Sequence, residues 1–67
     1  MKNFLKQFRS QKNLTQKQVA LLCEISERQY IRYENNNQEP SIYIALRLAH
    51  VLGTTVEELF PLEGEDA

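Results

Sequence analysis

The sequence has 67 residues, a formal net charge of −1 and a single cysteine, so it has room for one small domain without an internal disulfide. It has no apolar run near the roughly 20 residues of a membrane-spanning helix, and its N-terminal segment MKNFLKQFRS is too polar for a secretory signal. Cys23 and His50 lack neighbours at a metal-binding or catalytic spacing. Cys23 is interpreted as a core residue, and His50 as a residue on a helix surface. We expect a cytoplasmic protein with no enzymatic activity and no cofactor.

Five segments of helical periodicity follow one another, and none alternates in the way that predicts a β-strand. The expected helices span residues 3–12, 15–23, 26–35, 41–52 and 55–60. Four of them begin at a hydroxyl side chain: Thr15, Ser26, Ser41 and Thr55. In three of these helices, those that begin at Thr15, Ser26 and Thr55, a Gln or Glu three residues later predicts a capping box. The prediction is an all-α chain with one domain at 1–60 and an acidic C-terminal tail at 61–67.

The apolar residues repeat at helical spacing and predict which face of each helix is buried. The expected inward positions, in chain order, are Phe4, Leu5, Phe8, Val19, Leu22, Cys23, Tyr30, Tyr33, Ile42, Ala45, Leu48, Ala49 and Leu52. Only a few residues separate the second helix from the third, which is too short a connection for antiparallel neighbours. These two helices are therefore predicted to cross steeply, as in a helix-turn-helix.

The outer face of the third helix carries Arg28 and Arg32, one turn apart. Two forked guanidinium groups there have the chemistry to bind guanine O6 and N7 in a major groove. Glu27 could accept from a cytosine amino group, and Gln29 could bind adenine if its side chain is free of the helix cap. The alternative is that an arginine pairs internally with Glu24 or Glu27.

Charge is distributed unevenly along the chain. Residues 1–33 carry seven Lys or Arg against two Glu, whereas residues 34–67 carry one Arg against seven carboxylates. This asymmetry is consistent with a nucleic-acid-binding face in the first half, and equally with charges that only solvate helix surfaces.

The segment LTQKQVALLCEISERQYIRYENNNQEPS and the following IALRLAHVLGTTVEELF carry a specific pattern. Its marks are LTQ, a small Ala20, a hydrophobic Ile25 in the turn, YE at the end of the third helix, PS before the fourth, and LG and VEELF beyond. Together they resemble the Xre-type, lambda-repressor-like helix-turn-helix family of bacterial and phage regulators, over roughly residues 4–60. The resemblance implies a five-helix DNA-binding domain.

The resemblance also implies roles for single residues. It places the base-reading face at Glu27, Arg28, Gln29 and Arg32, and phosphate contacts at Gln16, Lys17, Asn35, Asn36 and Asn37. It pairs a first-helix arginine, Arg9, with the glutamate that ends the third helix, Glu34. The alternative for that pair is two solvated charges that contribute little.

Two positions depart from the family pattern. Glu24 stands where relatives usually have glycine in the turn, so the turn either accepts a left-handed glutamate, at about 1 kcal/mol, or takes another shape. The loop after the third helix offers neutral amides in place of glycine and basic residues. Asn36 can adopt glycine's conformation but carries no charge, so we expect a shallow salt dependence of DNA binding.

The family resemblance implies a sequence-specific regulator that binds double-stranded DNA, most simply a homodimeric repressor on a palindromic operator. Apolar residues near the C-terminus could form the dimer interface or could complete the monomer core: Val51, Val56, Leu59, Phe60 and Leu62. The alternative function is a protein-interaction module of the same fold, which binds another regulator or a toxin as its protein partner.

Overall fold

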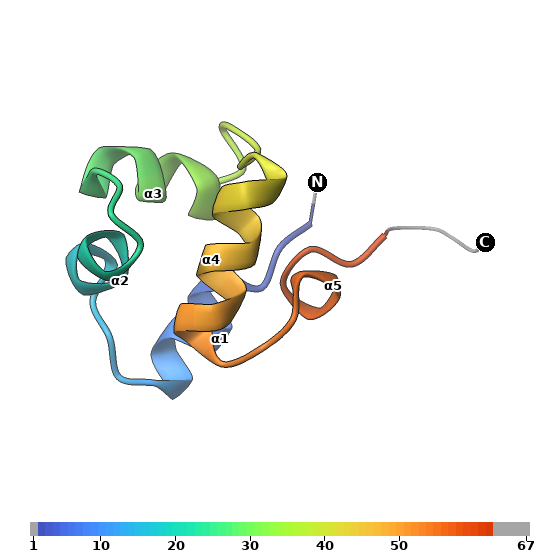
Figure 1. Cartoon of the computed structure of the whole chain (residues 1–67), viewed down its shortest axis with the longest axis horizontal. Helices are drawn as coiled ribbons and strands as arrows, with labels where there is room; N and C mark the ends of the chain where they lie inside the picture. The colour runs from blue at the N-terminus through green and yellow to red at the C-terminus, as the bar shows by residue number, and fades with distance from the viewer. Residues whose placement is uncertain (1, 63–67) are drawn as a thin grey trace.

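The structure, a computed structural model, describes residues 2–62, and every regular element among them is a helix. The helices are α1 (Leu5–Gln11), α2 (Gln16–Leu22), α3 (Glu27–Glu34), α4 (Ile42–Leu52) and α5 (Val56–Leu59). In Figure 1, α4 runs through the middle of the molecule, with α2 and α3 on one side of it and α5 on the other. This arrangement confirms the predicted all-α fold of five helices. Of the acidic tail predicted at 61–67, residues 63–67 lie outside the described residues.

The predicted N-caps start their helices. The hydroxyl of Thr15 accepts from the backbone N–H of Gln18 over 3.0 Å, and the Gln18 side chain accepts from the Thr15 N–H over 2.8 Å, which closes a capping box. Ser26, Ser41 and Thr55 each accept from the backbone N–H three residues later. These caps satisfy amide groups that helical geometry leaves without partners.

Two of the predicted capping boxes do not close. The side chain of Gln29 donates to the hydroxyl of Tyr33, and the carboxylate of Glu58 accepts from the hydroxyl of Thr54. In both cases the side chain instead forms a hydrogen bond with another side chain four residues away.

Four helices end in the same left-handed turn, α4 at Gly53 and the other three at a residue that is not glycine. Asn13, Glu24 and Asn36 have φ angles of 57°, 61° and 61° and follow the last turns of α1, α2 and α3. In each case the next residue donates its N–H to a carbonyl five positions earlier, at 3.2, 3.0 and 2.8 Å, which is the Schellman arrangement. The turn between α2 and α3 therefore takes the left-handed shape, with a glutamate where glycine is the residue of lowest strain.

Arg47 of α4 holds that turn from the side. Its Nη1 donates to the carbonyl oxygen of Cys23 over 2.9 Å, and the same nitrogen lies 3.6 Å from the Glu24 carboxylate. Nη2 donates to the hydroxyl of Tyr43 over 2.8 Å, and the guanidinium lies 4.7 Å from the centre of the Tyr43 ring. The central helix thus fixes the connection on which the angle between α2 and α3 depends.

The core lies where α4 meets the other helices. Its fully buried side chains are Leu5, Val19, Cys23, Tyr30, Leu48, Leu52 and Leu59, with Ala20, Tyr33 and Ala49 almost fully buried. Cys23 has a pKa raised by burial, in keeping with a core thiol. His50 is exposed, as predicted.

Two predicted core positions are wrong. Leu22 is 55% exposed, because Val19, Ala20 and Cys23 define the buried side of α2 and Leu22 lies roughly 100° around the helix from their mean direction. Ile42 is 69% exposed, because this first residue of α4 lines an open groove against Val56 of α5. Helical spacing indicated an apolar stripe in both helices but did not show its edges.

Candidate nucleic-acid interface

The outer face of α3 presents two arginines. Arg28 and Arg32 are exposed, whereas Tyr30 and Tyr33 are buried on the opposite side of the helix. Within residues 2–62 the ion pairs are Arg9 with Glu34 and Arg47 with Glu24, so neither outer arginine is engaged in one. The internal pairing of Arg28 or Arg32 with a glutamate, which the sequence left open, does not occur there.

A hollow of about 210 Å³ lies beside these arginines. Its lining combines the outer face of α3 with the loop before α4: Ser26, Arg28, Gln29, Arg32 and Gln38. Gln38 was not among the predicted base-reading residues, because no periodicity extends across a loop. Glu27 is exposed near the start of the same helix, and Ile31 is half-buried.

Gln29 is held by a partner that the sequence did not suggest. Its side-chain nitrogen donates to the Tyr33 hydroxyl, whereas its backbone N–H donates to Ser26 in the cap. The side chain is therefore fixed by the core tyrosine and not by the cap. Its oxygen and its second N–H are left to form other hydrogen bonds.

Glu34 joins three helices from the end of α3. Its carboxylate accepts from Nε and Nη2 of Arg9 on α1 at 2.9 and 3.3 Å, from Nε2 of Gln16 on α2 at 2.8 Å, and from the Tyr30 hydroxyl at 2.6 Å. The side chains of Arg9 and Glu34 are 14% and 5% exposed. Two parallel donors from one guanidinium to a nearly buried carboxylate form a strong, directional pair.

The surroundings of Glu34 shift several pKa values. Burial by itself raises the pKa of Glu34, but the hydrogen bonds from Arg9, Tyr30 and Gln16 outweigh it, and the net pKa is lowered. The hydrogen bond to Glu34 raises the pKa of Arg9. Burial, followed by the bond to Glu34, raises that of Tyr30. Glu34 is therefore charged, and Tyr30 neutral, at neutral pH.

The expected phosphate contacts lie at two places. Gln16 is half-buried at the start of α2 and bound to Glu34, and Lys17 beside it is exposed. Asn35, Asn36 and Asn37 are exposed in the turn after α3. The oxygen of the Asn36 side chain accepts from Nδ2 of Asn3 over 2.8 Å.

Sequence reasoning missed Asn3 altogether. Its Nδ2 also lies 3.2 Å from the carbonyl oxygen of Tyr33 and 3.5 Å from that of Glu34, and its Oδ1 accepts from the N–H of Leu5. A polar residue before the first helix gives no signal in a periodicity analysis, and these contacts span about thirty positions of the chain.

The C-terminal apolar residues divide into core and surface. Leu59 is fully buried within the protomer, where it completes the core, as the alternative interpretation had it. Val51, Val56 and Phe60 are half-buried against the core. Leu62 is 94% exposed.

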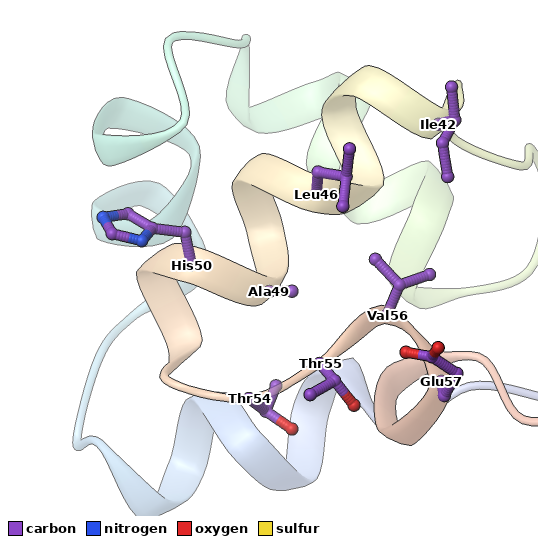
Figure 2. A pocket seen from close by; sticks show the side chains of 8 residues that line it. All are labelled: Ile42, Leu46, Ala49, His50, Thr54, Thr55, Val56 and Glu57. Carbon is purple, nitrogen blue, oxygen red and sulfur yellow. The ribbon is translucent and has the colours of Figure 1, made fainter.

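A groove between α4 and α5 was not predicted. It has a volume of about 620 Å³ and is lined by Ile42, Leu46, Ala49, His50, Thr54, Thr55, Val56 and Glu57. Figure 2 shows Ile42 and Leu46 on α4 near Val56 of α5, with His50 at the far end. Leu46 is 56% exposed there. A second hollow continues it through Ile42 and Val56 to Pro40 and Phe60.

No helix within residues 2–62 combines the length and the apolar character that crossing a membrane requires. In the same part of the chain, no three His, Cys, Asp or Glu side chains gather closely enough to hold a metal ion.

Comparisons with known proteins agree with this architecture. Residues 5–59 match the model of the helix-turn-helix family HTH_3. An uncharacterized HTH-type transcriptional regulator of Methanocaldococcus jannaschii is 33% identical over 66 residues, which cover 98% of this chain and 100% of the relative. Another from Archaeoglobus fulgidus is 26% identical, with 98% and 93% covered.

A similar solved structure belongs to a larger protein. The crystal structure of FeII HppE in complex with its substrate superposes with a TM-score of 0.81 and 31% sequence identity. The match covers 94% of this chain but only 37% of that one, so it concerns the fold of the shared segment. The family match over residues 5–59 and the two HTH-type relatives lead to one conclusion: this chain belongs to the Xre-type, lambda-repressor-like helix-turn-helix family.

Proposed function

We propose that this chain is a sequence-specific regulator of transcription that binds double-stranded DNA as a homodimeric repressor, with α3 in the major groove. The observation that carries the proposal is the pair of exposed arginines, Arg28 and Arg32, on the outer face of the second helix of the motif. Neither arginine has an ion-pair partner within the described residues, so both guanidinium groups are available for base edges.

The way α3 is held supports a reading role. Tyr30 and Tyr33 anchor its inner face in the core, and Glu34 ties its last turn to α1 and α2. A helix fixed in this way presents its outer side chains in one orientation, so little conformational entropy is lost when they bind. Base discrimination depends on such fixed geometry, because a bidentate contact tolerates little displacement.

Each outer residue has a proposed role. Arg28 and Arg32 bind guanine O6 and N7, and Glu27 accepts from cytosine. Gln29, held by Tyr33, keeps an acceptor and a donor for adenine. Gln16, Lys17 and the Asn35–Asn37 turn contact phosphates on either side of the groove.

The position of the acidic residues is compatible with this orientation. Glu57 and Glu58 lie on α5, which is on the other side of α4 from α3 in Figure 1. Carboxylates close to phosphates would repel, so DNA would approach α3 with α5 facing away. The lysines and arginines of the first half would then carry the attraction.

The proposed dimer uses the groove between α4 and α5. Ile42 and Leu46 project one turn apart beside a hollow bounded by Ala49 and Val56. In a two-fold contact one patch must offer both the projecting side chains and the hollow that receives them. A dimer can place two copies of α3 about 34 Å apart, in successive major grooves of a palindromic site. A repressor can block transcription simply by occupying its operator.

The test is selection of bound duplexes from a random library at near-physiological salt. An Arg28→Ala/Arg32→Ala variant runs in parallel, with a Lys6→Ala/Lys12→Ala variant, which also removes two cations, as its matched control. The proposal expects a palindrome enriched by the native protein and the lysine variant but not by the arginine variant. Absence of enrichment by the native protein would contradict the proposal and direct the search to a protein partner, which the apolar groove could accommodate.

A further inference from the structure

Asn3, Asn36 and the end of α3 form one connected set of hydrogen bonds. Oδ1 of Asn3 accepts from the N–H of Leu5 over 3.0 Å, and its Nδ2 donates to the carbonyl oxygen of Tyr33 over 3.2 Å. The same Nδ2 lies 2.8 Å from Oδ1 of Asn36. One side chain thus joins the first turn of α1 to the last turn of α3 and to the loop that follows it.

These contacts fix which way the Asn36 amide faces. An amide oxygen only accepts and an amide nitrogen only donates, so the Leu5 N–H and the Tyr33 carbonyl together determine the orientation of Asn3. The nitrogen of Asn3 must then meet the oxygen of Asn36. The Nδ2 group of Asn36, with two N–H donors, is consequently directed away from Asn3, on an exposed side chain.

The backbone beneath Asn36 is fixed as well. Its left-handed φ of 61° is held by the bond from its own N–H to the Tyr33 carbonyl and by that from Asn37 to Arg32, at 3.1 and 2.8 Å. Gln38, two residues further on, lines the same hollow as Arg28 and Arg32. The outward amide of Asn36 therefore stands just beyond the last turn of α3, on a backbone that two hydrogen bonds fix.

We infer that Asn3 is a positioning residue that orients the Asn36 amide as a preset hydrogen-bond donor for a phosphate of the DNA backbone. This inference rests on the proposed function and assigns a role to a residue outside the helix-turn-helix. The loop carries no cation, so an oriented amide supplies a phosphate contact that a lysine or arginine would otherwise provide. Orienting the amide in advance lowers the entropy lost on binding.

The consequences for binding are specific. Asn36→Gly keeps the left-handed backbone but removes both the link to Asn3 and the donor, so affinity for the selected duplex should fall about tenfold. Asn36→Asp keeps an acceptor for Asn3 but turns a carboxylate toward the phosphate. The loss of affinity for the selected duplex should therefore be larger than that of Asn36→Gly. Asn3→Ala releases the amide and should lower affinity about threefold.

Two further readouts separate this role from a general loss of structure. A neutral donor releases no counterion, so plots of affinity against salt for Asn3→Ala and Asn36→Gly should run parallel to that of the native protein. A phosphate contact carries no base information, so both variants should weaken all sequences equally. Because Asn3 acts through Asn36, the double variant should bind no more weakly than Asn36→Gly alone.

The experiment is a fluorescence-anisotropy titration of the selected duplex at several salt concentrations, below the melting temperature of every variant. Gln11→Ala, an exposed amide on α1, is the control and should bind like the native protein. Native-like binding by Asn3→Ala, or additive losses in the double variant, would overturn the inference and leave the proposed function standing. If Asn3→Ala fails to fold, native-like binding by Asn36→Gly overturns it equally. If the native protein binds no duplex, both proposals fall.

Discussion

Nε2 of Gln16 donates to Oε1 of Glu34 over 2.8 Å, which joins the first residue of α2 to the last residue of α3. Gln16 is also a proposed phosphate contact, and Glu34 ends the proposed reading helix. The two halves of the interface are therefore linked through one carboxylate, which Arg9 neutralises from α1. A change at Glu34 should alter stability first and DNA binding as a consequence.

Glu34→Gln should reduce the free energy of unfolding by about 3 kcal/mol, because Arg9 loses its partner in a nearly buried setting. Urea unfolding measures the change. Glu39→Gln, which replaces an exposed carboxylate, is the matched control and should have almost no effect. A cost for Glu34→Gln as small as that of the control would show that the pair contributes little.

Stability should depend on pH through the same residue. The pKa of Glu34 is lowered in the folded state from its ordinary 4.5, so its contribution is complete above about pH 4.5 and is lost as the pH falls through the lowered value. Urea unfolding from about pH 7 to about pH 3 should show this loss in the native protein, and a smaller loss in Glu34→Gln. Identical pH profiles would exclude Glu34 as the titrating group.

Glu24→Gly should stabilise the protein by about 0.5–1 kcal/mol, because glycine adopts the left-handed conformation without strain. The ion pair that is lost, at 3.6 Å with Glu24 80% exposed, is worth little. Thermal unfolding tests this. Asn13→Gly serves as the control, with almost no gain expected, because asparagine already tolerates this conformation. A lower melting temperature for Glu24→Gly would mean that the contact with Arg47 outweighs the strain.

Leu46→Glu should convert the proposed dimer into a monomer, because the substitution puts two carboxylates into an apolar two-fold contact. The protomer fold should persist, since Leu46 is 56% exposed. Sedimentation equilibrium at micromolar concentration should give about twice 7.9 kDa for the native chain and 7.9 kDa for the variant. Leu21→Glu, at a leucine 75% exposed on α2, should leave the mass unchanged. A native chain that sediments as a monomer would remove the dimer from the proposal.

Arg28→Ala and Lys17→Ala should weaken DNA binding in different ways. Loss of Arg28 should cost about 1–3 kcal/mol and relax the preference at one base pair, whereas loss of Lys17 should weaken all sequences equally and reduce the salt slope by about one. Competition titrations with single-base variants of the selected duplex distinguish these outcomes. A uniform loss for Arg28→Ala would reassign that arginine to a phosphate.

Local signals in the sequence were enough to locate the helices, because each cap and each left-handed stop involves residues only a few positions apart, as at Thr15 and Asn13. The buried faces were predicted less well: Leu22 and Ile42 lie at the edges of apolar stripes, and the neighbouring helix decides whether an edge is covered. The hydrogen bonds of Asn3 and Gln16 could not be predicted, because they join residues 18 to 33 positions apart and depend on how the helices pack. For the interface, the family pattern supplied residue positions but not their partners, such as Tyr33 for Gln29.

The side chains that secure α3 and those that it exposes are different residues. Tyr30, Tyr33 and Glu34 hold the helix from its inner face, while Arg28 and Arg32 project from the other. Substitutions on the outer face should therefore carry little folding cost. A duplicated gene could acquire a new operator through a few changes there, with the scaffold untouched, so divergence of regulatory targets would not be limited by the stability of so small a protein.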